Sequence, residues 1–247
     1  MEIYGLLGRS LSHSFSEKYF SEKFRKENIT DCQYRNFELK DLKKEIGKLK
    51  NEPDLKGFNI TIPYKRDIIP FVDELTEECQ IINACNCIKV SDGKWIGYNT
   101  DIIGFERSFV RHLKHYHKSA LILGTGGASN AVAFVLKKLN IDFLKVSRKK
   151  DPASSIVSYD DLPQIFSDYQ IVINTTPLGT FPDLKEYPPL PYDMVSGQYY
   201  FFDLIYNPPT TTFLSLAQKK GATIENGEKM LSIQAEESWS IWKGRLF

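Results

Sequence analysis

Hydrophobic residues recur along this chain with two periods, one typical of buried strands and one typical of amphipathic helices, and the two alternate from the first residues onward. Residues 3–7 are predicted to form a strand. Residues 15–26 are predicted to form a helix, because Tyr19, Phe20 and Phe24 fall on one side of it. The alternation continues with a strand at 32–39, a helix at 42–49 and a strand at 57–61. This opening region is therefore predicted to be α/β.

The next region is predicted to hold a hairpin and then a helix. Two short strands, at 85–90 and 94–98, flank Ser91-Asp92-Gly93, a combination typical of a tight β-turn. Thr100 is a candidate N-cap for a helix over residues 102–112.

A glycine-rich turn stands at the centre of the second half of the chain. A strand at 120–123 runs directly into Gly124-Thr125-Gly126-Gly127-Ala128-Ser129, and a helix to about Leu139 and a second strand at 143–146 follow. A strand, a glycine-rich turn, a helix and a strand within about thirty residues predict a right-handed βαβ unit. Two α/β lobes joined near residues 98–104 are the simplest organisation. Further elements are predicted as strands at 169–174 and 199–204 and a last helix at 227–242.

Composition favours a protein that recognises a small molecule. Hydrophobic residues make up 42% of the 247 positions and charged residues 26%, values that predict a buried core. Lys plus Arg (32) nearly cancel Asp plus Glu (31), so no overall basic field is available for nucleic acid or an anionic membrane. No run of 18 apolar residues and no basic, apolar leader is present, and four cysteines without an export signal favour a reducing cytoplasm.

Two groups of potential metal ligands are weak. Cys85 and Cys87 lack a second ligand pair, and zinc usually needs four converging ligands. His112, His115 and His117 do not fall on one helical face and have no acidic or cysteine partners nearby in the sequence. We therefore expect no metal, structural thiols and solvated histidines.

The glycine-rich turn favours a dinucleotide, and the strand after it indicates which one. Glycine lets backbone N–H groups approach phosphates, and the following helix presents its positive end. Gly124 and Gly126 match the first two glycines of the G-x-G-x-x-G pattern, with Ser129 at the third position. NAD enzymes place an Asp or Glu after the second strand, but here Ser147-Arg148-Lys149 stands there. Although such a stretch is often only a solvated basic loop, Arg148 can grip a 2′-phosphate, which favours NADP. The missing acid also argues against an S-adenosylmethionine methyltransferase.

Six short strings carry more polar groups than a neutral turn needs. Singly, each has an ordinary explanation, because serines cap helices, a lone lysine is usually solvated, and Asn and Asp are common in turns. The alternative is that hydroxyl groups beside a helix N-terminus bind a carboxylate. The strings are Gly8-Arg9-Ser10-Leu11-Ser12-His13-Ser14-Phe15-Ser16, Asn59-Ile60-Thr61-Ile62-Pro63-Tyr64-Lys65, Asn83-Ala84-Cys85-Asn86, Gly97-Tyr98-Asn99-Thr100-Asp101-Ile102-Ile103-Gly104, Asp203-Leu204-Ile205-Tyr206-Asn207-Pro208 and Asn226-Gly227-Glu228-Lys229-Met230-Leu231-Ser232-Ile233-Gln234-Ala235.

In this order the strings resemble the shikimate dehydrogenase family, whose members reduce 3-dehydroshikimate with NADPH in the biosynthesis of chorismate and the aromatic amino acids. The resemblance extends from Gly8 to Gln234. It implies an N-terminal α/β substrate-binding catalytic domain (1–100) and a Rossmann-like NADP-binding domain (101–226). It further implies that the C-terminal helix (227–247) packs back on the first lobe.

The resemblance also implies roles for single residues. Lys65 and Asp101 match the catalytic pair. The residues that match substrate contacts are Ser14 and Ser16 for the carboxylate, assisted by Tyr206, and Thr61, Asn86 and Gln234 for ring hydroxyls. The residues that match cofactor contacts are Gly124, Gly126, Gly127 and Ala128 of the pyrophosphate turn, Ser147, Arg148 and Lys149 at the 2′-phosphate, Thr175 in the loop beside the cofactor and Gly227 at the nicotinamide.

Some positions depart from the family pattern. Ser10 and Glu17 stand where proline is usual, and Ser147 and Lys149 stand where Asn and Thr are more common, while Arg148 is retained. Reduction of a ketone requires a hydride on carbon and a proton on oxygen. Our interpretation is that Lys65 supplies the proton, with Asp101 bound to the same substrate oxygen.

Two alternatives stay open. A quinate/shikimate dehydrogenase of the same superfamily accepts quinate and often NAD, and an acid at the ribose position would favour it. A non-catalytic nucleotide-sensing module on the same fold would be favoured by loss of Lys65 or Asp101, but both are present. The aromatic-rich helices are compatible with a monomer or a homodimer.

Overall fold

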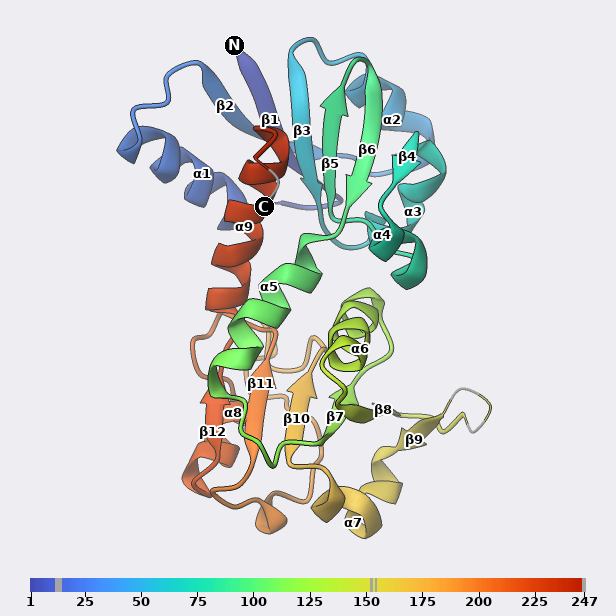
Figure 1. Cartoon of the computed structure of the whole chain (residues 1–247), viewed down its shortest axis with the longest axis vertical. Helices are drawn as coiled ribbons and strands as arrows, with labels where there is room; N and C mark the ends of the chain where they lie inside the picture. Colours follow the sequence, from blue (N-terminus) through green and yellow to red (C-terminus); the bar gives the residue numbers. More distant parts are fainter. Residues whose placement is uncertain (12–14, 152, 154, 246–247) are drawn as a thin grey trace. The chain divides into compact units, whose positions relative to one another are not determined.

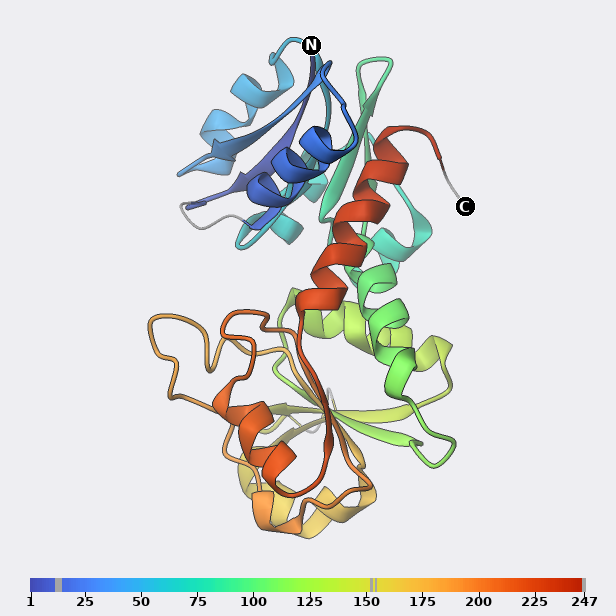
Figure 2. The ribbon, with the colours of Figure 1, turned by 90° about the vertical axis from the view of Figure 1, so that its left-hand side faces the viewer.

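The computed structural model describes residues 1–11, 15–151, 153 and 155–245, and the chain divides into two compact units (Figure 1). Unit 1 consists of residues 1–100 and 234–247, and unit 2 consists of residues 101–233. Each unit holds a six-stranded sheet with helices on both faces (Figures 1 and 2). The fold is thus α/β with two lobes, as the strand and helix pattern predicts.

Unit 1 contains a mixed sheet in the order β2-β1-β3-β5-β6-β4. Strand β1 pairs in parallel with β2 and β3, whereas β3–β5 and β5–β6 are antiparallel. The strands are β1 (Glu2–Gly8), β2 (Cys32–Glu38), β3 (Leu55–Ile60), β4 (Glu74–Leu75), β5 (Cys87–Ser91) and β6 (Lys94–Tyr98). The helices are α1 (Phe15–Lys26), α2 (Leu42–Lys50), α3 (Tyr64–Asp67), α4 (Glu77–Ile82) and the second half of α9 (Glu228–Trp242).

Both faces of this sheet are buried, which explains the nearly continuous apolar sequence of β1. Ile3 and Leu7 pack with α2 on one face, while Tyr4 and Leu6 pack with α1 and the second half of α9 on the other. Figure 2 shows α1 and α9 on the same side of the sheet. The contact there is aromatic, with the Tyr4 ring stacked on Trp242 at a centroid distance of 4.9 Å.

Unit 2 contains a fully parallel sheet in the order β12-β11-β10-β7-β8-β9. The chain winds outward from β7 in one direction and from β10 in the other, so these two strands flank a topological switch point. The strands are β7 (Ser119–Leu123), β8 (Asp142–Ser147), β9 (Ile156–Ser158), β10 (Ile171–Asn174), β11 (Tyr200–Asp203) and β12 (Thr223–Glu225). The helices are α5 (Thr100–Phe109), α6 (Gly127–Lys138), α7 (Leu162–Ile165), α8 (Thr212–Lys219) and the first half of α9.

Alternate residues of these strands face different helices, as the strand period requires. Phe201 of β11 packs in the core with α7 and α8. Tyr200 and Phe202 turn the other way, toward Phe109 and Phe105 of α5, with ring centroids 5.3 and 5.2 Å apart.

Three local predictions differ from the structure. Cys85 and Asn86 precede strand β5, which begins at Cys87. Thr100 is the first residue of α5 rather than its cap. The expectation of solvated histidines is wrong for His117, which is buried between the Lys114 N–H and the Gln198 carbonyl. In a neutral imidazole one ring nitrogen accepts and the other donates, so these two hydrogen bonds, to Nδ1 and from Nε2, satisfy the His117 ring without solvent.

No helix within the described part of the chain is long and apolar enough to cross a membrane. Within the same residues, no three His, Cys, Asp or Glu side chains are grouped so that they could hold a metal ion.

Gly57 of β3 is required by the packing of Trp242 in unit 1. A Cβ atom at this position would overlap the Trp242 ring and approach the Ile88 carbonyl oxygen to 2.8 Å. That carbonyl accepts the hydrogen bond of the indole Nε1 at 2.9 Å. A methyl group would therefore displace the ring and break a buried hydrogen bond.

We predict that Gly57→Ala lowers the free energy of unfolding by about 2–4 kcal/mol, measured by urea denaturation. Gly47→Ala is the matched control, because Gly47 lies in α2 with no atom within 4 Å of the added methyl. There the substitution should stabilise the protein by about 0.5–1 kcal/mol, since alanine is the better helix former. Equal effects at the two sites would contradict the packing argument.

Candidate active site

Lys65 is held at a fixed place by the segment that follows β3. The Thr61 N–H donates to the Leu7 carbonyl at 2.9 Å, and the Tyr64 hydroxyl donates to the Leu39 carbonyl at 2.5 Å. The carbonyl of Lys65 accepts from the Cys85 N–H at 2.8 Å. The backbone before Lys65 is therefore tied to β1, and the backbone at Lys65 to the segment just before β5. Its side chain is half-buried, as is that of Thr61.

Asn86 is oriented by its neighbours in unit 1. Its side chain is only 4% exposed, and Oδ1 accepts from the Thr100 N–H at 2.7 Å and the Thr100 hydroxyl at 3.3 Å. Its backbone carbonyl accepts from the Asn59 amide at 3.3 Å and from the Ile60 N–H at 2.8 Å. Because the Oδ1 atom is engaged by Thr100, the Nδ2 group is the part of this side chain suited to donate to a ligand.

A buried polar relay centred on Asn59 joins several predicted substrate residues. The Tyr34 hydroxyl accepts a hydrogen bond from Ser16 and donates to Asn59 Oδ1 at 3.1 Å. The Asn59 Nδ2 group donates to the Ser238 hydroxyl at 2.8 Å. That hydroxyl in turn donates to the Gln234 carbonyl at 2.8 Å. Strands β2 and β3, helix α1 and helix α9 are thus connected by polar contacts within unit 1.

Sequence reasoning assigned no role to Tyr34, Asn59 or Ser238. A signal was available for Asn59, because an amide between the apolar residues Phe58 and Ile60 of a predicted buried strand needs a partner. It also stands two residues before Thr61, on the same face of an extended segment. Ser14 was predicted beside Ser16, but it lies outside the described residues.

The polar cluster of unit 1 defines what it can bind. Ser16 is linked to the relay through Tyr34, and Gln234 and Asn86 through their backbone carbonyls. Thr61 and Lys65, both half-buried, follow Asn59 on the segment after β3. Such groups suit a small molecule with several hydroxyls and one negative charge.

Asp101 and Tyr206 belong to unit 2. Asp101 lies in the first turn of α5, where the positive end of the helix favours a carboxylate, and it is 4% exposed. Tyr206 follows β11 and is half-buried, and this burial raises the pKa of its hydroxyl. Asp101 is therefore buried and Tyr206 half-buried, so neither is an ordinary solvent-exposed surface residue.

The glycine-rich turn after β7 fits a dinucleotide pyrophosphate. Gly124 has a φ of 108°, and a Cβ there would lie 2.8 Å from the Thr175 hydroxyl. Gly126 and Gly127 have no atom within 4 Å of a would-be Cβ, so the backbone is open to a ligand. Gly126 is the N-cap of α6 and has no side chain that could occupy the N–H groups of the first turn. Ala128, which is half-buried, lies in that turn. The N–H groups of that turn are thus positioned for phosphate oxygens.

A buried carboxylate holds the loop after β10 in unit 2. Asp203, fully buried, accepts from Asn174 Nδ2 at 3.0 Å and the Thr211 hydroxyl at 2.6 Å. Burial raises its pKa to about 6. Asn174 Oδ1 accepts from the Thr176 N–H at 3.0 Å, and the Thr175 hydroxyl donates to the Leu123 carbonyl at 2.6 Å. Thr175 is thereby fixed against the end of β7, at the switch point.

The remaining predicted cofactor residues lie on two other segments of unit 2. Ser147 ends β8 and is half-buried, whereas Arg148 and Lys149 are exposed. Arg148 lies near Tyr159, where its charge partly offsets the rise in the Tyr159 pKa caused by burial. Gly227 is buried, and a Cβ there would overlap the Leu204 carbonyl. Only glycine fits at this close backbone approach.

The chain is similar to characterised proteins over nearly its whole length. The sequence profile of the shikimate dehydrogenase substrate binding domain matches residues 6–88. A shikimate dehydrogenase (NADP(+)) of Caldicellulosiruptor bescii is 40% identical, over 96% of this chain and 88% of the relative.

Solved structures agree with this similarity. The shikimate dehydrogenase of Aquifex aeolicus superposes with a TM-score of 0.88 at 31% identity, covering 99% of this chain and 93% of that one. The enzyme of Thermus thermophilus, solved with NADP(H) and shikimate, gives 0.86 at 26% identity, covering 99% and 94%. The similarity of sequence and of fold over both units leads to one conclusion: this chain belongs to the shikimate dehydrogenase family.

Proposed function

We propose that this chain is a shikimate dehydrogenase that catalyses the reversible NADPH-dependent reduction of 3-dehydroshikimate to shikimate, in the pathway to chorismate and the aromatic amino acids. The observation that carries the proposal is the polar cluster of unit 1 in a member of this family. Its hydroxyl and amide groups are complementary to a hydroxylated ring, and the half-buried Lys65 follows Thr61 by four residues on the segment after β3.

The substrate contacts follow from the chemistry of each group. Ser14 and Ser16, with Tyr206, are assigned to the substrate carboxylate, because hydroxyl groups donate well to carboxylate oxygens. Thr61, Asn86 and Gln234 are assigned to ring hydroxyls, since amide and hydroxyl groups can both donate and accept there. A site with hydrogen-bonding groups aimed at substrate hydroxyls rejects analogues that lack them.

Bound NADP(H) supplies or accepts the hydride at the carbonyl carbon. In the proposal, Gly124, Gly126, Gly127 and Ala128 hold the pyrophosphate, Ser147, Arg148 and Lys149 hold the 2′-phosphate, and Thr175 and Gly227 bound the nicotinamide end. The open backbone at Gly126 and Gly127 supports the first of these assignments.

Lys65 is the proposed general acid–base. During reduction its ammonium gives a proton to the oxygen that becomes the new hydroxyl, and during oxidation its amine takes that proton back. Asp101 is assigned to the same oxygen and to orienting the ammonium. Because the Lys65 backbone is fixed by the Cys85 N–H, little reorientation of its main chain is needed before proton transfer.

The finer partners and location are also proposals. We infer that the chain acts as a monomer or homodimer in the cytoplasm, on a small-molecule substrate and without nucleic acid or membrane. The four cysteines are free thiols, which supports a reducing compartment.

The first test is the absorbance of reduced nicotinamide after mixing the protein with shikimate or quinate and with NADP or NAD. We expect strong reduction with shikimate and NADP. Comparable activity with quinate or NAD would instead identify a quinate/shikimate dehydrogenase. A folded protein that binds NADPH but reduces neither cofactor would be a nucleotide-sensing module.

Replacement of Lys65 tests the acid–base assignment. We predict that Lys65→Ala lowers kcat by about 10²–10⁴ while the affinity for NADPH, measured by fluorescence titration, stays near that of the wild type. Asp101→Asn should also impair turnover and spare NADPH binding. Arg66→Ala is the matched control, because Arg66 is the exposed neighbour on the same short helix and should leave kcat unchanged. A near-normal kcat in Lys65→Ala would reject the assignment.

Replacement of Arg148 tests the cofactor preference. We predict that Arg148→Ala raises KM for NADP by about tenfold and leaves KM for NAD within twofold, because only NADP carries the 2′-phosphate. Lys150→Ala is the control, since the Lys150 ammonium is already paired with Asp161 at 3.1 Å. Parallel changes for both cofactors in Arg148→Ala would mean that the residue supports folding of the loop rather than the phosphate.

A further inference from the structure

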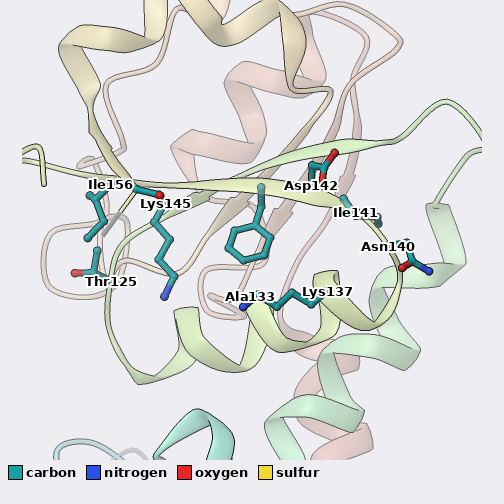
Figure 3. A pocket seen from close by; sticks show the side chains of 10 residues that line it. Thr125, Ala133, Lys137, Asn140, Ile141, Asp142, Lys145 and Ile156 are labelled. Atoms are coloured by element: carbon teal, nitrogen blue, oxygen red, sulfur yellow. The ribbon is translucent and has the colours of Figure 1, made fainter. Parts of the chain in front are cut away.

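A cavity of about 750 Å³ lies in unit 2 between α6 and β8 (Figure 3). Strands β8 and β9 are parallel neighbours, but only residues 148–155 connect them. Parallel strands are usually joined by a dozen or more residues that include a helix. The described residues of this short connection form no α-helix, so the face of β8 beside α6 is left partly open.

The Lys145 side chain projects from β8 into this cavity. Leu144 and Val146 of the same strand pack into the core with α7 and α8, and Lys145 points to the opposite face. Its Nζ atom donates to Asn130 Oδ1 at 2.8 Å. Because Asn130 is the fourth residue of α6, the ammonium is held beside the N-terminal turn of that helix, on the side where Thr125 of the glycine-rich turn lines the cavity (Figure 3).

Several features make this end of the cavity attractive to an anion. The positive N-terminal end of α6 and the Lys145 ammonium both contribute positive electrostatic potential there. Ser147, two residues further along β8, points to the same side of the strand and carries a hydroxyl donor. The Asp142 carboxylate also lines the cavity, but it stands at the start of β8, about 10 Å from Lys145 along the strand.

Burial distinguishes Lys145 from the basic residues that follow β8. Arg148 and Lys149 are exposed, whereas Lys145 is half-buried. Solvent and salt screen an exposed charge more strongly than one in a cavity. A phosphate oxygen that reaches this cavity therefore interacts more strongly with Lys145 than with an equally distant surface lysine.

We propose that Lys145 binds the 2′-phosphate of NADP(H) together with Arg148, and that the preference for NADP over NAD depends mainly on this half-buried lysine. The inference rests on the proposed function, since it names a further cofactor-binding residue for the same reaction. In this proposal the adenosine 2′-phosphate binds at the end of the cavity near Thr125, and Phe143 and Ile156 form the apolar wall beside it.

The test compares binding of 2′,5′-ADP and 5′-AMP, which differ only in the 2′-phosphate, by titration calorimetry. The variant is Lys145→Met, which keeps the aliphatic stem and removes the charge. We expect the affinity for 2′,5′-ADP to fall about 10- to 100-fold, the effect of one lost charge-assisted hydrogen bond, and the affinity for 5′-AMP to stay within twofold.

Lys137→Met is the matched control. Lys137 lines the same cavity but lies seven residues, or about 10 Å, after Asn130 along α6. It should leave both affinities within twofold. Equal weakening of both nucleotides by Lys145→Met would overturn the inference and indicate a structural lysine. An equal effect of Lys137→Met would also overturn it, because it would mean that the positive charge of the cavity as a whole, and not Lys145 in particular, attracts the phosphate.

The outcome also separates this inference from the proposed function. If the wild-type protein bound 2′,5′-ADP no better than 5′-AMP, the NADP assignment itself would fail, and the role of Lys145 with it. If the wild type discriminated and Arg148→Ala reduced the discrimination while Lys145→Met did not, only the inference on Lys145 would be wrong.

Discussion

The hydrogen bonds of the Asn59 side chain are the constraint on which unit 1 most depends. An amide in the interior costs free energy unless both of its ends find partners. Here Oδ1 is satisfied by Tyr34 and Nδ2 by Ser238 and the Asn86 carbonyl. Those partners come from β2, α9 and the segment before β5, so one side chain connects elements that are far apart in sequence. Satisfying this amide leaves little freedom in the relative positions of β2, β3, the segment before β5 and the second half of α9 within unit 1.

Unit 2 uses the same principle with a different group. Asp203 is buried among neutral donors rather than beside a cation, which is why burial raises its pKa. Its contacts with Asn174 and Thr211 join the ends of β10 and β11 to the start of α8. The loop that carries Thr175 is thereby fixed next to the glycine-rich turn. A rigid loop at a switch point gives a cofactor a preformed surface, so less ordering is needed on binding.

Polar residues were predicted best where a motif has its own local geometry. The turn from Gly124 to Ser129 and the basic residue at Arg148 follow from rules that involve only neighbours in sequence. Tyr34 and Ser238 were not found, because nothing near them in the sequence indicates that they share a partner. His117 was misjudged for the same reason, since its acceptor, the Gln198 carbonyl, is 81 residues away. The resemblance to a family supplied Lys65, Asp101 and Gln234, which periodicity alone did not distinguish from ordinary surface residues.

The sequence by itself determined the alternation of strands and helices, the two α/β lobes and the glycine-rich βαβ unit, because these depend on periodicity and on turn chemistry within a few residues. The tertiary structure decided which polar groups meet. The polar relay of unit 1, the close approach that demands glycine at Gly227, and the cavity beside Lys145 all depend on contacts between segments far apart in the chain. Such contacts are set by how sheets and helices stack and by the short connection between β8 and β9. Local sequence patterns carry no direct record of that stacking.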